Sequence, residues 1–470
     1  MAASIDFEAA ERENPKLKAF YDDKRLFYRN VFWLVFGGAA ATLGVNLANT
    51  VMPLHMAKIG LDAEEISGVM AIRGYLTLPL ALFLAQLSDR WQGKAGRRLP
   101  FLAASIPFTV FGMILFPYTA STLSCVLVFA VFHFAMNVKY DTYPFIAYDI
   151  ARKPYWGRVN GLNLVMGGIA IWLGQIWLMP LMDVKGDAEV YLMAAIVLAV
   201  ASLATVIFSK EPPLRTETPP DFNPVKVIGH IIRVGFSDKR IVQLFVANAL
   251  VCGFGVSAMY IPLQAQVNMG MSTGDIGTQI LQYGTIINTC LVFFVGWAID
   301  KIGSTKAILA GFTMGLFATI IAFDPTSALT VSIFSAVASF SSAVLGVTFT
   351  PSPAIALAVA NVLIVMTTTL TYWGQHVFTA SWVRREDLAT FGTCNGAVNV
   401  LVNTIAVQIS GVLIKRVFGG NYGVGFVVGA VICAIGVPMY FWVARTRTRE
   451  LALEAASAPA GAGPTPTAGS

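Results

Sequence analysis

The feature that most constrains this chain is a series of apolar runs, each roughly 20 residues long, separated by short polar segments. A helix of that length spans the hydrocarbon core of a bilayer, where only helices and closed barrels satisfy every backbone hydrogen bond. Only 12% of the residues are charged, about half the share found in soluble domains. The sequence therefore predicts an all-α membrane protein that crosses the bilayer many times.

Twelve of these runs are expected to span the membrane, six on each side of a polar central stretch. They cover 31–56, 66–87, 100–118, 123–148, 162–182, 190–209, 241–266, 276–298, 307–323, 354–378, 398–414 and 424–443. The predicted organisation is an N-terminal segment (1–30), a six-helix bundle (31–209), a central loop (210–240), a second six-helix bundle (241–444) and a largely disordered tail (445–470). Apolar residues at helical spacing within 225–236 predict an amphipathic helix on the membrane surface.

The distribution of positive charge predicts the topology. Most of the 32 Lys and Arg residues fall at the termini, in the central loop and in the loops on the same side of the membrane. Because cytoplasmic loops are enriched in Lys and Arg, both termini are expected to be cytoplasmic. The same rule requires an even number of crossings between the loops at 300–306 and 383–387. The apolar, serine-rich run 327–350 is therefore expected not to make a separate full crossing.

Three ionisable side chains are expected deep inside the predicted spans, where charge is costly and usually functional. They are Arg73 in the second span and Lys139 and Asp141 in the fourth. His133, Asn137 and Asp141 recur every four residues, so they share one helix face, with Tyr140 beside them. Asp141 is the main candidate for proton coupling, and His133 and His376 are further candidates. A static salt bridge between helices is the alternative for Arg73 and Asp141.

Amides and aromatic rings in other spans are candidates for hydrogen bonding and stacking to a polar solute. The candidate set for substrate binding consists of Asn46, Asn49, Arg73, Asn137, Lys139, Tyr140, Gln264, Gln282, Tyr283, Tyr372 and Gln375. For any one of them, a hydrogen bond between helices is an equally good interpretation. His55 and His230 lie near the membrane interfaces and are interpreted as structural.

The two halves repeat one loop motif after their second spans. The first copy contains Ala85, Asp89, Arg90, Gly96, Arg97 and Arg98, and the second contains Gly296, Asp300, Lys301, Gly303 and Lys306. This repeat resembles the signature of the major facilitator superfamily. Within it, the segment SDRWQGKAGRRLPFL at Ser88–Leu102 is similar to the glycoside–pentoside–hexuronide and sucrose symporter branch.

The resemblance implies two pseudo-symmetric six-helix bundles that move by alternating access, with the first and fourth spans of each half lining a central cavity. It implies that loop charges form ion pairs that close the cytoplasmic side, although they could instead serve topology alone. The gating set is Asp89, Arg90, Arg97, Arg98, Arg158, Asp300 and Lys306. Sodium-coupled members of that branch carry paired acids in the second span. Here the stretch Arg73–Leu82 has none, so a proton is the expected coupling ion.

The predicted function is proton-coupled symport of a sugar, glycoside or similar polar solute by a monomer. The sequence contains no phosphate-binding loop and no metalloprotease motif, so no enzymatic activity or cofactor is expected. The five cysteines lie in apolar runs without metal-ligand spacing, which predicts neither a disulfide framework nor a metal site. The charge distribution does not indicate a nucleic-acid partner. The alternatives are an organic-anion (hexuronate-like) transporter, an amphiphile or lysolipid transporter, and a non-transporting membrane sensor.

Overall fold

The computed structural model describes residues 14–91, 93, 96–213, 229, 233, 235, 236, 238–345, 350–382 and 388–457. Within these ranges the chain is almost entirely helical, and ten helical segments are long and apolar enough to cross a bilayer. Two more long helices, α4 and α14, occupy the second place in each half. The predicted all-α architecture with two six-helix halves is confirmed.

The N-terminal half contains a short leading helix and six rods. Its elements are α2 (Pro15–Asp22), α3 (Lys24–Lys58), α4 (Ala63–Arg90), α5 (Leu99–Leu115), η1 (Phe116–Tyr118), α6 (Thr122–Ile150), η2 (Lys153–Tyr155), α7 (Trp156–Leu173), η3 (Gly174–Leu178), α8 (Met179–Lys185) and α9 (Asp187–Phe208). The segments α7, η3 and α8 follow one another without a break and form a single rod.

The C-terminal half repeats this plan and adds one helix. Its elements are α11 (Lys239–Val251), α12 (Gly255–Leu263), η4 (Gln264–Asn268), α13 (Thr273–Asp275), η5 (Ile276–Leu281), α14 (Gln282–Ile302), α15 (Ser304–Phe323), α16 (Ala328–Leu345), α17 (Pro353–Trp382), α18 (Leu388–Arg416) and α19 (Val424–Ser457). The amphipathic helix expected within 225–236 and the tail after 457 fall largely or wholly outside the described residues.

Local sequence sets several helix boundaries. The Asp62 side chain accepts hydrogen bonds from the backbone N–H groups of Glu64 and Glu65, while the Glu65 carboxylate accepts from the Asp62 N–H. This reciprocal cap begins α4 at the end where backbone donors have no helical partner. Ser121 and Ser124 begin α6 in the same way. Gly60, with φ of 88°, makes the tight turn between α3 and α4.

Three stretches of π-helix interrupt the rods at η3, η4 and η5. A π-turn contains one residue more than an α-turn, and such bulges occur frequently at functional sites. All three lie near the same end of the bundle, and η3 contacts η5 across the boundary between the halves. Sequence periodicity did not predict them.

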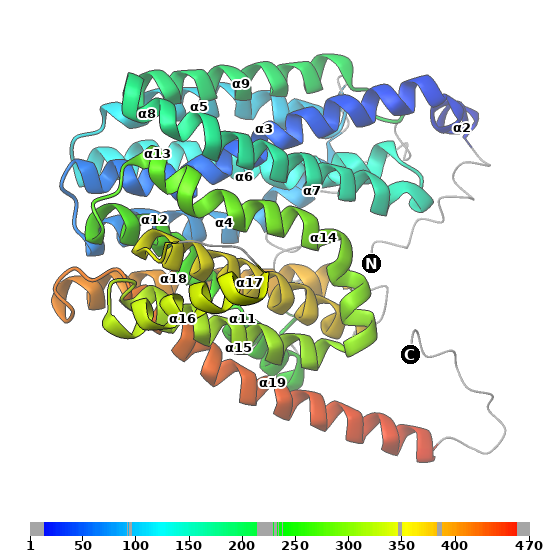
Figure 1. Cartoon of the computed structure of the whole chain (residues 1–470). Helices are drawn as coiled ribbons and strands as arrows, with labels where there is room; N and C mark the ends of the chain where they lie inside the picture. The colour runs from blue at the N-terminus through cyan, green and yellow to red at the C-terminus, as the bar shows by residue number, and fades with distance from the viewer. Residues whose placement is uncertain are drawn as a thin grey trace.

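Figure 1 shows the two halves side by side, the N-terminal half in blue to teal and the C-terminal half in green to red. One end of the bundle carries α2 and the C-terminal end of α19, and we call it the α2 side. The opposite end carries α8 and α13, and we call it the α8 side. The halves meet mainly through α4 with α18 and α7 with α14, with smaller contacts of α3 with α12 and α8 with α13.

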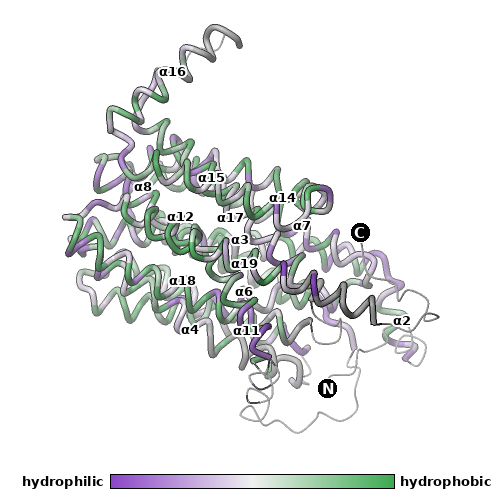
Figure 2. Tube along the Cα trace, turned by 90° about the horizontal axis from the view of Figure 1, so that it is seen from below, coloured by the Kyte–Doolittle hydropathy of each residue, from purple (hydrophilic) through white to green (hydrophobic). Residues whose placement is uncertain are grey.

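Helix α16 departs from the packed bundle. It contacts α17, and Figure 2 shows it pointing away from the other helices, with mostly hydrophobic colouring. Leu329, Val331 and Ile333 are exposed on its surface. The helix falls within the run 327–350, and residues 346–349 lie outside the described part of the chain. The expectation that this run makes no separate full crossing stays a prediction.

Candidate transport pathway and gate

Two predicted residues on neighbouring helices of the N-terminal half meet directly. Arg73 of α4 donates a hydrogen bond from Nη1 to Oδ1 of Asn49 in α3, at 2.6 Å. Asn46 lies one turn before Asn49 on the same helix and is half-buried. Arg73 remains exposed, and its helix α4 packs against α6, which carries His133. The structure therefore brings Arg73 and Asn49 together on helices next to the one that carries His133.

The polar face of α6 is only partly described. His133 is 1% exposed and packs against Phe129 with ring centroids 4.1 Å apart and the rings tilted by 53°, and its Nε2 has no hydrogen-bond partner. The Nδ2 of Asn137 is buried and also lacks a partner. The side chains of Tyr140 and Asp141 lie outside the described residues. Helix α4, which carries Arg73, packs against α6, which carries Asp141. This arrangement is compatible with a coupling of Arg73 to Asp141, which stays a prediction.

Lys139 lies inside the N-terminal half. Its side chain is fully buried, and Nζ donates to Oγ1 of Thr109 at 3.2 Å and to Oγ of Ser202 at 3.0 Å. These partners belong to α5 and α9, so Lys139 points into the packed interior of its own half. These contacts favour a structural role for Lys139, and a role in solute binding stays a prediction.

In the C-terminal half, Tyr372 and His376 come together on α17, with ring centroids 4.4 Å apart. Gln375 is buried, and its Nε2 donates to Sγ of Cys252 at 3.2 Å while its Oε1 has no partner. The Oε1 of Gln264, in η4, is also buried without a partner.

The remaining two candidates of this half lie on α14. Gln282 donates to the carbonyl oxygen of Thr278 in the preceding stretch η5, and Tyr283 is exposed. Gln282 therefore already satisfies one of its two amide donors locally.

On the α2 side, a buried charge cluster ties together segments of the N-terminal half. Arg97 contacts both carboxylate oxygens of Asp149 at 2.6 Å, and Nε of Arg98 donates to Oδ2 of Asp149 at 2.8 Å. The Glu211 carboxylate accepts hydrogen bonds from the backbone N–H groups of Arg97, Arg98 and Leu99 at the start of α5. Burial raises the pKa of Glu211, and these three backbone donors offset part of that increase.

These partners belong to α6 and to the segment that follows α9, so they brace one half. Of the other predicted gating residues, Asp89, Arg90 and Asp300 have side chains outside the described residues. Arg158 lies over the ring of Tyr155 at 5.8 Å, again within the N-terminal half. Lys306 is exposed. A cytoplasmic latch built from this set stays a prediction.

Ion pairs that join the two halves lie at the opposite end, on the α8 side. Nζ of Lys415 is 2.6 Å from Oδ2 of Asp62 and 3.7 Å from Oε2 of Glu64. Nη2 of Arg416 is 2.6 Å from Oε1 of Glu64. These four residues connect the start of α4 to the end of α18, and we call them the α8-side latch. Burial acts to raise the pKa of Asp62, but Lys415 and two backbone donors outweigh it and hold that pKa below its ordinary value of 3.8.

Further contacts close the halves together behind this latch. Ser67 of α4 and Tyr260 of α12 share a hydrogen bond of 3.0 Å, and the Gly274 N–H donates to Oδ2 of Asp183 at 2.7 Å. The helices also approach closely at Gly277, where a Cβ would overlap the carbonyl oxygen of Gln175. Halfway along α4, Tyr75 donates to Oε1 of Gln408 at 2.8 Å.

The latch was missed at the sequence level. Its signal was present as an acidic segment at 62–65 and a basic pair at 415–416, both next to predicted span ends. The sequence does not indicate that the second and eleventh spans are neighbours. The packing of α4 against α18 in the structure shows that they are.

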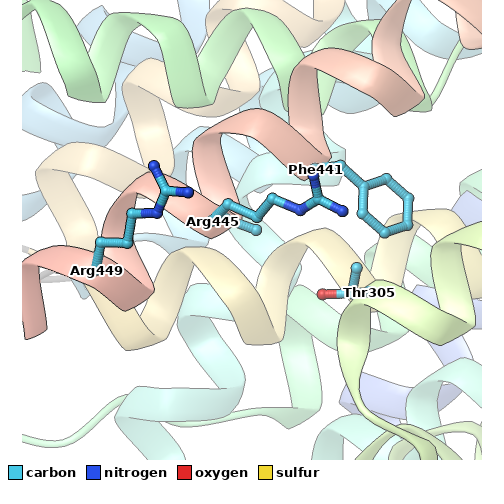
Figure 3. A pocket seen from close by; sticks show the side chains of 5 residues that line it. Thr305, Phe441, Arg445 and Arg449 are labelled. Carbon is cyan, nitrogen blue, oxygen red and sulfur yellow. The ribbon is translucent and has the colours of Figure 1, made fainter. Parts of the chain in front are cut away.

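Two hollows lie outside the boundary between the halves. Thr305, Phe441, Arg445 and Arg449 line one of about 350 Å³ between α15 and α19 on the α2 side (Figure 3). The other, of about 590 Å³, lies between α18 and α19 and has only apolar lining residues, among them Ile409, Phe418 and Val431. Most of its lining residues belong to membrane-spanning helices, so lipid tails are the expected contents.

The sequence profile of the Major Facilitator Superfamily matches residues 34–360, which is more than half of the chain. The chain belongs to the Major Facilitator Superfamily. As a member of this superfamily it is an integral, multi-pass membrane transporter of small solutes. No curated protein sequence matches the chain.

Solved structures of superfamily transporters share the fold. A mutant of the nucleoside transporter NupG has a TM-score of 0.69 at 13% identity, covering 88% of this chain and 99% of that one. A bacterial homologue of the human lysosomal transporter Spinster, inward-facing and unoccupied, has a TM-score of 0.61 at 15% identity, covering 92% and 98%. A POT family transporter in complex with 5-aminolevulinic acid has a TM-score of 0.61 at 12% identity, covering 88% and 96%.

Proposed function

We propose that this transporter works by alternating access, with the α8 side as its outer face, and that the structure represents the state closed to the outside. The observation that carries this proposal is the α8-side latch, in which Asp62 and Glu64 of one half pair with Lys415 and Arg416 of the other. Ion pairs between two rigid bodies favour one arrangement and can be broken in each cycle. The positive-inside rule supports the assignment of sides, because the basic loops lie on the α2 side.

The proposed solute is small, polar and rich in hydroxyl groups, such as a sugar or glycoside. Gln264, Gln375 and Asn137 each place an unpartnered amide atom in the protein interior. A buried polar group without a hydrogen bond is costly, so these groups favour a bound solute or water as the missing partner. The paired rings of Tyr372 and His376 add a surface for stacking against a sugar ring.

Proton coupling is assigned to Asp141, with His133 and His376 as additional proton carriers. The support is the position of Asp141 on a helix that packs against α4, which carries Arg73. A carboxylate in a partly dry site binds a proton more readily, and a nearby cation opposes this, so solute arrival can shift the balance. We expect Asp141→Asn to abolish uphill uptake while sparing exchange of solute across the membrane.

An organic anion such as a hexuronate is the second candidate solute. The observation that favours it is Arg73, an exposed cation within the span formed by α4. Guanidinium groups bind carboxylates in a bidentate geometry, and Asn49 already orients this one. A free sugar and its uronate differ only in that carboxylate, so a direct comparison of the two separates the candidates.

The test is uptake into proteoliposomes with and without an imposed pH gradient. The panel contains sugars, glycosides, uronates, nucleosides and lysolipids, with nucleosides included because NupG is described as a nucleoside transporter. We expect accumulation of a hydroxyl-rich solute only when the outside is acidic. Accumulation without a pH gradient contradicts proton coupling. Uptake of none of these solutes, together with a latch that stays closed under all conditions, contradicts the proposed transport function.

A further inference from the structure

A positively charged hollow lies at the α2 end of the C-terminal half. Its volume is about 350 Å³, and its lining residues are Thr305 at the start of α15 and Phe441, Ala444, Arg445 and Arg449 on α19. Figure 3 shows the side chains of Arg445 and Arg449 extending from α19 and Thr305 on the neighbouring helix. Because the two arginines are one helical turn apart, their charges lie on one face of α19. The hollow thus gathers two guanidinium groups and a hydroxyl between two helices.

The charges of these arginines are not balanced by acids. Arg445 and Arg449 are exposed, and neither forms an ion pair with a carboxylate in the part of the chain that the structure describes. Lys301 and Lys306, also exposed, add positive charge on either side of Gly303, the residue before α15. Like charges one turn apart destabilise a helix. An anion bound between the two guanidinium groups would remove that repulsion.

The start of α15 supplies further donors to this hollow. The helix begins at Ser304 after Gly303, whose φ is 85°, and no side chain caps its first backbone N–H groups. These N–H groups have no partner within the helix, and the helix dipole favours negative charge beside them. Thr305 is the second residue of α15, so the uncapped end of the helix lies at the wall of the hollow. Charged and neutral donors in this combination match the oxygens of a phosphate group.

The position of the hollow along its helices places it at the level of the lipid headgroups. The apolar span within α19 ends at Thr446, between Arg445 and Arg449. One turn further into the membrane, Trp442 of α19 and Leu309 of α15 are exposed, and Figure 1 shows α19 along the outer edge of the bundle. Trp is enriched where the hydrocarbon core meets water. A ligand in the hollow therefore has guanidinium groups at one end and lipid-facing apolar side chains at the other.

We propose that this hollow binds the phosphate headgroup of an anionic phospholipid from the leaflet on the α2 side. Arg445 and Arg449 pair with the phosphate oxygens, and Thr305 donates a further hydrogen bond. The acyl chains lie against Trp442 and Leu309. Basic pockets between membrane-spanning helices bind anionic headgroups by the same chemistry. A free phosphate ion offers the same oxygens but gains nothing from the apolar side chains, which favours the lipid.

The site goes beyond the proposed transport function. Both helices that form it belong to the C-terminal half, so binding requires neither a particular solute nor the α8-side latch. The bound lipid connects α15 to α19, and it should therefore stabilise the folded protein.

The test is direct binding of phosphatidylglycerol to the purified full chain in a maltoside detergent. Native mass spectrometry counts the lipids retained on the protein, and thermal unfolding gives Tm at increasing lipid concentration. We expect phosphatidylglycerol to be retained and to raise Tm, because a ligand that binds only the folded protein stabilises it. Phosphatidylcholine, whose phosphate charge is offset by its own ammonium group, should bind about tenfold more weakly.

Substitutions locate the bound lipid. Arg445→Gln with Arg449→Gln should lower the apparent affinity for phosphatidylglycerol about tenfold, because hydrogen bonds between charged groups are strong. Ala444→Phe, which fills the hollow and leaves every charge in place, should lower it as well. Arg25→Gln with Arg29→Gln is the matched control, since these arginines are also exposed and one turn apart at the α2 side, but on α3. The control should bind phosphatidylglycerol as the wild type does.

Three outcomes would overturn the proposal. Unchanged affinity after replacement of Arg445 and Arg449 excludes them as ligands of the lipid, and unchanged affinity in Ala444→Phe excludes the hollow as its site. Equal losses in the Arg445 and Arg449 variant and in the Arg25 and Arg29 control show that the lipid follows surface charge alone. Inorganic phosphate that raises the wild-type Tm as much as phosphatidylglycerol does makes the ligand a free ion. The Tm of each variant without lipid checks that it is folded.

Discussion

Lys415 and Asp62 lie 2.6 Å apart across the boundary between the two halves, although 353 positions separate them in the sequence. Their contact holds the start of α4 beside the end of α18 at one end of the bundle. The pair is largely exposed to solvent, with side-chain exposures of 45% and 35%. Its contribution is therefore modest and sensitive to salt, which suits a contact that must break in every transport cycle.

Removing one charge from this pair should open the α8 side. The opening can be measured as the distance between spin labels placed at Val184 in the N-terminal half and Val267 in the C-terminal half, both exposed. Lys415→Gln and Asp62→Asn should each raise the fraction of molecules with a long distance between these labels. The increase should be at most a few-fold, because exposed ion pairs are individually weak. The charge exchange Asp62→Lys with Lys415→Asp should restore much of the closed population. A charge exchange that behaves like the sum of its single variants would falsify the role of this pair.

The pairing of Lys415 with Asp62 also predicts that closure of the α8 side weakens at low pH. Because the pKa of Asp62 is lowered in the closed state, ionised Asp62 stabilises closure above its ordinary value of 3.8, and this contribution is lost as the pH falls through the lowered value. The closed fraction should decrease below about pH 4. Asp62→Asn should show no such decrease, and the label distances of both proteins between pH 3 and pH 6 provide the comparison.

Close packing at Gly277 should be needed for closure of the α8 side. An alanine Cβ there would overlap the carbonyl oxygen of Gln175 and approach Met179 across the boundary. Gly277→Ala should therefore shift the protein toward the open arrangement and increase labelling of cysteines placed between α8 and α13. Gly68→Ala is the matched control, since a Cβ there meets nothing within 4 Å. Equal effects of the two substitutions would argue against this packing explanation.

Lys139 offers a test that separates a structural role from a binding role. Its only described partners are the hydroxyls of Thr109 and Ser202, and burying a cation without an acid is costly. Lys139→Met, which fills a similar volume, should leave Tm in detergent unchanged or higher and should preserve uptake. Lys139→Ala leaves a cavity and should lower stability by about 2–5 kcal/mol. Loss of uptake in Lys139→Met at normal Tm would instead assign it to the solute.

Much of the fold follows from the sequence. Apolar runs of spanning length gave the helices and their division into two halves, because lipid forces the backbone into helices wherever such a run occurs. The ends of the helices differ from the predicted span ends where polar residues continue the helix. The predicted span 31–56 became α3, Lys24–Lys58, since the segment before residue 31 can remain helical outside the hydrocarbon.

Single residues were harder to place. Spacing along α6 put Lys139 about 200° from Asp141, yet its charge alone suggested a pathway role, and only the packing of α5 and α9 shows that its face points inward. Arg73 and Asn49 were both candidates, but nothing in the sequence indicated that they would meet. Contacts between the halves, such as Ser67 with Tyr260, depend on which helices are neighbours. Periodicity within one segment does not carry that information.

The π-helical stretches also affect how this chain can be compared with others. Each adds one residue to a turn, so the face of the helix rotates by about 100° beyond it. In the rod formed by η5 and α14, residues before Ile276 and after Leu281 therefore do not follow one continuous 3.6-residue phase. If a functional position is assigned from a relative without this bulge, the alignment must be offset by one residue beyond it. Without that offset the assigned residue lies on the wrong side of the helix.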